Sequence, residues 1–451
     1  MHNVAALACL VLLAAPAPAA KSDGGLSLET ATELALRDNP LVEASRGGLD
    51  EFEAKYRQAI LAWIPQGKLE FMATLLPKMT GNAVEHETDN SVWGPYLKSQ
   101  FTLVQPIYSF GKLTHLKTLA AAGIDVGKAQ VRMAEGEIRF MVARAWYTLV
   151  FTSQVEEIFR EGEEYLEKAR KRLAEQEEED ADSFDQIDIL RLRVYEAEIA
   201  SMRLEATRAA RIARYSLHLL TNLPEDEIQP SAKLLVPASF GAWTLPELEA
   251  LARQQRPDLA ALEAGLRAMR VKLTIEKRKW APDLFAVGSV RMNWAPYVEN
   301  QHTPFADDPF NTTLGTGAAL GLQWKLDIGA RLAGTDEARA GIRMMRGNLN
   351  GMLLKARVDL ADRFTAATDA RELISIYRRA YKAGRGWAMA KTDLYENGLE
   401  DLKQVIEGIT KFYSTKLAYL NAILQFNLSV AALARSCGVP AAELDADPQD
   451  E

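Results

Sequence analysis

The chain has 451 residues, of which 48% are hydrophobic and 25% are charged, and its formal net charge is -8. This composition is typical of a folded chain and excludes a largely disordered one. The negative charge and the lack of Lys/Arg runs argue against a nucleic-acid-binding protein. The 2 cysteines stand near opposite ends, and the 5 histidines are scattered, so neither a disulfide framework nor a metal site is expected.

The first residues read as an export signal. Residues 4–15 form an apolar run too short to span a bilayer, and Ala17-Pro18-Ala19 fits a small-x-small cleavage rule. We therefore expect a signal peptide over 1–19, with Ala20 as the rival end point, although no Lys or Arg precedes the run. Cys9 sits in a poor lipobox, so we expect no lipid anchor, and we expect no transmembrane helix after residue 20.

Two long stretches of the sequence contain no proline. None of the 18 prolines lies between Pro106 and Pro224, or between Pro309 and Pro440. Because proline costs about 3 kcal/mol inside a helix, these windows favour long helices, and their apolar residues recur at heptad-like spacing. Each window has one polar break, at 175–185 and at 396–401. The pattern predicts two helical hairpins, over about 112–222 and 330–437.

The chain reads as a duplication. Residues 28–65 align without a gap with 245–282, and later pairs of motifs keep nearly the same offset. We therefore predict a first repeat over 26–224, a linker over 225–244 and a second repeat over 245–441. An acidic tail is expected over 442–451.

Between the helices, the apolar period changes from 3.6 to 2. This pattern predicts strands at about 66–77, 95–107, 282–294 and 313–326, each apolar on one side. We expect loops over 78–94 and 295–312, which place Asp89, Asp307 and Asp308 in solvent. The strand length and the aromatic residues at the strand ends are typical of an outer-membrane barrel, although a soluble sheet with one wet face gives the same alternation. Four strands cannot close a wide barrel, so several chains would have to share one.

This arrangement resembles the TolC family of outer-membrane efflux proteins. The resemblance rests on the duplicated openings "LSLETATELALRDNPLVEA" and "WTLPELEALARQQRPDLAA", the strand exits "QPIYSFGK" and "WKLDIGAR", and the hairpin tip "YENGLEDLKQVIEG". It implies an α+β membrane protein: a tandem repeat of two strands plus a long α-helical hairpin. It also implies a homotrimer with a 12-stranded β-barrel in the outer membrane, continued by an α-helical periplasmic barrel. Outer-membrane lipid, a periplasmic adaptor (membrane fusion) protein and an inner-membrane pump are the implied partners.

The candidate functional residues lie at the two hairpin tips. Asp182 and Asp185 belong to an acidic run that is either a solvated face or a cation-attracting mouth. The other candidates follow from the resemblance, by alignment on the helix-breaking Gly398. Gln404 and Glu407 fall at positions of acidic rings, Tyr395 at a gate tyrosine and Asp188 at its aspartate partner. Glu400 occupies the position of the gate arginine, which puts the usual gate pairing in doubt.

These observations favour a passive exit duct of a tripartite efflux or type I secretion system. The chain carries no nucleotide-binding loop, no cofactor motif and no recognisable catalytic set, so we expect no enzymatic activity. The spacing of Gly315, Gly317 and Gly321 does not fit a dinucleotide fingerprint. The alternative is a soluble periplasmic coiled-coil adaptor or scaffold without a pore, whose strand faces would form an ordinary core.

Overall fold

The computed structural model describes residues 25–81, 85–178, 186–300, 302–303, 306–307, 310–397 and 399–445, so the predicted signal peptide lies outside it. The chain divides into two compact units. The first comprises Met1–Asp38, Met141–Ala238 and Asp369–Leu428, and the second comprises Asn39–Phe140, Ser239–Thr368 and Ser429–Glu451. Each unit takes segments from both halves of the chain, so the compact units follow a different division from the sequence repeat.

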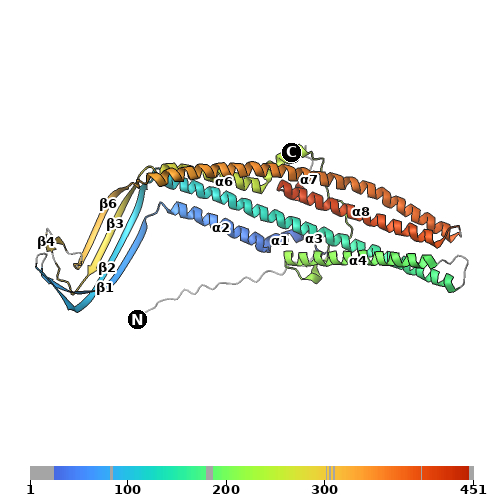
Figure 1. Ribbon diagram of the computed structural model, residues 1–451, viewed down its shortest axis with the longest axis horizontal. Helices are drawn as coiled ribbons and strands as arrows, with labels where there is room; N and C mark the ends of the chain where they lie inside the picture. Colours follow the sequence, from blue (N-terminus) through green and yellow to red (C-terminus); the bar gives the residue numbers. More distant parts are fainter. Residues whose placement is uncertain are drawn as a thin grey trace, which may run out of the picture. The chain divides into compact units, whose positions relative to one another are not determined.

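The helices of the two halves match in order and almost in length (Figure 1). The pairs are α1 (Leu28–Asp38) with α5 (Leu245–Gln255), α2 (Pro40–Leu61) with α6 (Pro257–Arg278), α3 (Lys112–Glu178) with α7 (Ile328–Glu396), and α4 (Gln186–Thr221) with α8 (Leu402–Cys437). Their lengths are 11 and 11, 22 and 22, 67 and 69, and 36 and 36 residues. Two short 3-10 helices, η1 (Glu225–Glu227) and η2 (Ala441–Leu444), follow α4 and α8.

A proline ends each short helix and starts the next one. Asn39 and Arg256 precede prolines and have extended backbones, as proline sterics require, and Pro40 and Pro257 occupy the first turns of α2 and α6. The Asn39 side chain accepts a hydrogen bond from the backbone N–H of Leu41 at 2.9 Å, which caps α2. The Arg256 side chain does not cap α6. It contacts other helices instead, as described below.

In the second unit, four strands form one antiparallel sheet in the order β1-β2-β3-β6 (Figure 1). They are β1 (Gln66–Gly81), β2 (His86–Tyr108), β3 (Asp283–Trp294) and β6 (Thr313–Gln323), while the two-residue strands β4 (His302–Thr303) and β5 (Ala306–Asp307) pair with each other.

The expected loop over 78–94 is wrong, because β1 and β2 continue through it and Asp89 lies in β2, paired with Lys78. The ladder tolerates Pro77 through a register shift directly after it. Pro95 lies beyond the last pair that β2 makes with β3, Leu97 with Trp294, so its missing N–H removes no central bond. Asp307 lies in β5, and Asp308 is outside the described residues.

The second unit has a core where α5, α7 and the end of α8 meet. Leu248, Leu360, Leu433 and Leu444 are at most 1% exposed in it. The chain therefore packs as far as Leu444, whose carbonyl accepts hydrogen bonds from Gly241 N and Trp243 Nε1, inside the expected acidic tail. Cys437 is buried in the same core, and this burial raises the pKa of its thiol to about 12.

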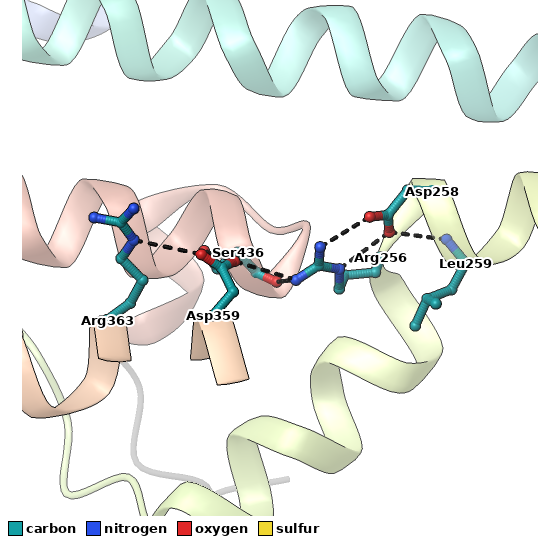
Figure 2. Close-up of polar contacts among 6 residues, drawn as sticks. All are labelled: Arg256, Asp258, Leu259, Asp359, Arg363 and Ser436. Carbon is teal, nitrogen blue, oxygen red and sulfur yellow. Dashed lines mark hydrogen bonds and ion pairs between the residues drawn. The ribbon is translucent and has the colours of Figure 1, made fainter. Parts of the chain in front are cut away.

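Arg256 joins three helices beside that core. Its guanidinium donates to Asp258 Oδ2 at 2.8 Å and to the carbonyl of Ser436, near the end of α8, at 3.1 Å. Asp359 of α7 lies 3.5 Å away and accepts a 2.9 Å bond from Ser436 Oγ (Figure 2). α8 ends at Cys437, and the next residue, Gly438, adopts a left-handed φ of 80° close to the Gln255 carbonyl.

The first unit ties its segments together through backbone carbonyls. Trp146 of α3 donates its indole N–H to the carbonyl of Leu26 at 2.9 Å. The amide of Asn427 in α8 accepts from Ala238 N at 2.7 Å and donates to Val236 O at 2.9 Å. The predicted linker over 225–244 therefore makes hydrogen bonds to α8 in its second half. By length and composition, the segment Lys403–Cys437 could cross a membrane, which we did not expect, but 56% of its most apolar window is buried, as in a core helix.

Candidate functional site

The register of the sheet brings all four apolar strand sides to one face. Directly paired residues point to the same side, and the pairs run Leu69 with Phe101, Phe101 with Val290, and Val290 with Thr316. By the same alternation, the predicted apolar residues of every strand share this face. They are Leu69, Phe71, Ala73, Leu75, Leu97, Phe101, Leu103, Leu284, Ala286, Val290, Met292, Trp294, Leu314, Leu320 and Leu322.

This apolar face is open. Leu69, Phe71, Leu314 and Leu320 are 68–76% exposed, and most other large side chains on it are also exposed. Leaving a large apolar side chain in water forgoes about 1.5–3 kcal/mol. An open face of this size marks a surface that meets lipid or protein.

The opposite face is polar, with small residues beside large ones. One rung across it consists of Glu70, Gln100, Arg291 and Gly315. Gly321 lies opposite Phe285, and a Cβ at Gly321 would come within 2.6 Å of the Phe285 ring. Small residues therefore make room for larger neighbours on this face.

Aromatic residues lie at both ends of the apolar face, as the sequence predicts. Trp93, Trp294 and Tyr297 are exposed at the end that holds the β1–β2 turn. Trp280, Trp324 and Tyr108 are exposed where the strands meet the helices. This placement matches the aromatic girdles at the two interfaces of a membrane barrel.

Both edges of the sheet are unpaired along most of their length within the described chain. β1 forms a ladder only with β2, apart from one isolated bridge between Met79 and Val298, and β6 forms a ladder only with β3. An unpaired edge cannot face hydrocarbon, because its N–H and C=O groups would lack partners. A sheet that meets lipid with its apolar face therefore needs further strands at both edges.

The structure describes only some of the residues predicted to act at the hairpin tips. Asp182, Asp185 and Gly398 lie outside the described residues, and Asp188 falls in α4 with only its backbone described. Tyr395 is half-buried near the end of α7, and Gln404 is half-buried in the first turn of α8. Glu407, one turn later, is exposed and makes no ion pair among the residues described.

Glu400 is already paired inside its own hairpin. Its carboxylate accepts a 2.6 Å bond from Lys391 Nζ, and the two side chains are only 20% and 19% exposed. Sequence reasoning missed Lys391, because its distance from Glu400 depends on the shape of the turn and not on a helical repeat. The pair fills the place where the resemblance led us to expect a gate arginine.

Further along the first unit, α3 and α8 share a second polar cluster that was not predicted. Lys416 Nζ donates to Glu161 Oε2 at 3.1 Å, and the Tyr165 and Tyr413 rings lie 6.2 Å apart. Burial, and then the negative charge of Glu161, raise the pKa of Tyr413 above its ordinary value. Tyr413 therefore stays protonated at neutral pH and can donate a hydrogen bond.

A cavity of about 740 Å³ lies in the first unit between α3, α4, α7 and α8. Its walls include Ile158, Met389, Tyr395, Ile406 and Tyr413. Among the described residues, no group of His, Cys, Asp and Glu has the geometry of a metal site. The described hairpins thus offer polar and apolar surfaces and no set of metal ligands.

Comparison with known proteins supports the family resemblance. Residues 248–439 match the family model "Outer membrane efflux protein". A search of curated proteins gives no match. Among solved structures, the fold is similar to the outer-membrane channel OprN (17% identity, TM-score 0.73, covering 92% of this chain and 90% of that one).

Two further channels show the same fold. The open state of the Neisseria gonorrhoeae MtrE outer membrane channel has a TM-score of 0.72 at 16% identity, with 91% and 89% of the two chains covered. The Campylobacter jejuni CmeC outer membrane channel has a TM-score of 0.70 at 14% identity, with 91% and 85% covered. The family model thus matches the second half of the chain, and the fold of nearly the whole chain is similar to that of these outer membrane channels.

Proposed function

We propose that three copies of this chain form a passive duct that carries substrates across the outer membrane. The observation that carries the proposal is the four-stranded sheet, with one apolar face continuous over all strands and an edge strand on each side that is unpaired along most of its length in the described chain. If β6 of one copy pairs with β1 of the next, three copies close a barrel of twelve strands. The apolar face then meets lipid, and the polar face lines the duct.

The long helices would continue the duct into the periplasm. α3 and α7 contain 67 and 69 residues, which corresponds to about 100 Å each at 1.5 Å per residue. Six hairpins from three copies would pack side by side and bury one another's apolar seams. A periplasmic adaptor protein and an inner-membrane pump would complete the assembly and supply its energy, in an efflux or a type I secretion system.

The hairpin tips would form the periplasmic constriction. Glu407, exposed and without an ion pair among the described residues, would place three carboxylates around the axis, with Gln404 as a neutral ring. Asp182 and Asp185 would extend this negative mouth, and Asp188 and Tyr395 would link the hairpins near Gly398. Glu400 would hold its own tip together through Lys391 and would not reach a neighbouring copy.

Single-channel conductance in a planar bilayer, with chemical cross-linking of the same detergent-extracted sample, tests the proposal. We expect discrete conductance steps, a cross-linked trimer and a preference for cations. A protein that partitions into the aqueous phase and never inserts would contradict the duct. Its sheet would then belong to the pore-less periplasmic scaffold.

A further inference from the structure

The two repeats differ in charge where their strands meet their helices. In the second repeat this region carries Lys277, Arg278, Lys279, Lys325 and Arg331, which we call the cationic junction. The gapless alignment places Ile60, Leu61 and Ala62 opposite the first three of these residues. The alignment of Phe110-Gly111-Lys112 with Ile328-Gly329-Ala330 places Ile107 opposite Lys325 and Leu113 opposite Arg331. We call this set the apolar junction.

The cationic junction adjoins the apolar face of the sheet. Trp324 continues the alternation of Leu320 and Leu322, so it falls on that face. Its indole N–H donates to the carbonyl of Trp280 at 2.9 Å, and the Arg331 guanidinium lies 5.7 Å from the centre of the Trp280 ring. Arg331 also donates to the carbonyl of Lys325. Two exposed indoles and several cations therefore share one place at the end of the apolar surface.

Much of this positive charge is not neutralised by the protein. Lys279 pairs with Glu276 at 2.7 Å, and Arg278 donates to the carbonyl of Phe110 at 2.8 Å. Lys277 and Lys325 are exposed and form no ion pair within the described chain. Arg331 contacts a ring and a carbonyl, and its Nη1 atom is buried without a hydrogen-bond partner.

The helix dipole explains only part of this arrangement. Lys277 and Lys279 lie at the carboxyl end of α6, where cations are favoured. Lys325 and Arg331 are not on α6, because they lie on either side of the start of α7. Beside the apolar junction, the start of α3 carries one cation, Lys112. It forms an ion pair with Asp283 at 2.8 Å. The excess of charge therefore belongs to the second repeat alone.

We propose that the cationic junction binds the phosphate group of an anionic phospholipid in the leaflet beside it. This inference rests on the proposed function, in which the apolar face meets lipid. Indoles prefer the headgroup level of a bilayer, and lysine and arginine side chains reach from the edge of an apolar surface to phosphate oxygens. In the closed barrel, cationic and apolar junctions would alternate around the rim.

Native mass spectrometry of the full-length protein from vesicles containing equal amounts of phosphatidylglycerol and phosphatidylcholine tests this site. We expect the wild-type protein to retain phosphatidylglycerol preferentially. Lys277→Gln with Lys325→Gln should reduce this preference by about 25-fold, because one cation near an anionic surface is worth about a factor of five. The matched control, Arg208→Gln with Arg211→Gln, removes two exposed cations from α4 and should retain the preference.

Channel recordings in neutral bilayers separate the two proposals. Wild type and both double variants should conduct alike there. Conducting protein that retains the two lipids equally would overturn the lipid site and leave the duct intact, whereas protein that never inserts would contradict the duct itself. Inorganic phosphate at matched ionic strength should not displace the retained lipid. Displacement would show a site for free phosphate and would also overturn the proposal.

Discussion

The two repeats build the same elements with different chemistry at matching points. Asn39 and Arg256 both stand before the proline that starts a 22-residue helix. Asn39 caps its own helix, whereas Arg256 reaches across to α7 and to the end of α8. The order of the helices is therefore the same in both repeats, whereas the side chains that precede the prolines make different contacts. Substitutions made in one repeat at a time test how far the two repeats differ in these contacts.

The largest difference is expected at these two positions. Arg256→Ala should lower the free energy of unfolding by about 3 kcal/mol, because Asp258, Asp359 and the Ser436 carbonyl lose a shared, largely buried donor. Asn39→Ala should cost about 1 kcal/mol, the value of one cap. Urea unfolding in detergent measures both. Arg253→Ala, which removes an exposed arginine of α5, is the control and should change stability by less than about 0.5 kcal/mol.

The same network sets a pH dependence. Burial alone would raise the pKa of Asp258, but the hydrogen bond and charge of Arg256 outweigh it and hold that pKa below its ordinary value. A lowered folded-state pKa contributes stability that is present above the unfolded pKa of about 3.9 and is lost as the pH falls through the folded value. The acid-induced loss should therefore be smaller in Arg256→Gln. Equal losses in the two proteins would show that Asp258 is not coupled to Arg256.

The two hairpins offer the next contrast. Lys391 and Glu400 form a largely buried pair in the second hairpin, whereas Arg203 is an exposed clamp on Glu156 and Glu163 in the first. Lys391→Ala should cost about 2 kcal/mol, because Glu400 is left without its cation, and Lys391→Ala with Glu400→Ala should cost less. Arg203→Gln should lower the free energy of unfolding by less, because water weakens the exposed ion pairs of Arg203 with Glu156 and Glu163. A double-mutant cycle without coupling would contradict the pairing of Lys391 with Glu400.

The two junctions can be exchanged in part. Ile60→Lys places a cation in the apolar junction at the position that corresponds to Lys277. We expect the preference for anionic lipid to rise by about fivefold, because one cation is added near the headgroups. Retention of phosphatidylglycerol over phosphatidylcholine measures the change. Ile60→Gln makes the site polar without charge and should leave the preference unchanged.

The faces of the sheet were predictable from sequence, and its ends were not. The alternation from Leu314 to Leu322 requires one apolar side whatever the partner strand is, and the observed register aligns these sides. The strand bounds predicted at residues 77 and 95 were too short, because the sequence does not show which neighbouring strands are present at each position. In the structure, a register shift follows Pro77, and Pro95 lies beyond the end of β3.

The tip was predictable only by resemblance, and its internal contacts were not predictable at all. Alignment placed Glu400 and Glu407 near a gate, but the partner of Glu400 depends on how the chain turns between α7 and α8. Helical periodicity ends at Glu396, so no repeat connects Lys391 with Glu400. The same limit applies to Tyr413 and Glu161, which come from helices far apart in the chain.

The smallest expected effect concerns Gln404 and Glu407, which stand one turn apart on α8 and differ in charge. In the proposed trimer, Glu407→Gln removes three charges from the constriction, and Gln404→Glu adds three. The permeability ratio of cations to anions, read from reversal potentials in a salt gradient, should fall about twofold in the first variant and rise in the second. Both changes should shrink near 1 M salt, where the screening length is about 3 Å, compared with about 10 Å at 0.1 M. Two unchanged ratios at low salt would mean that this turn of α8 does not face the conducting path, and the constriction would then have to lie at the first hairpin, around Asp188.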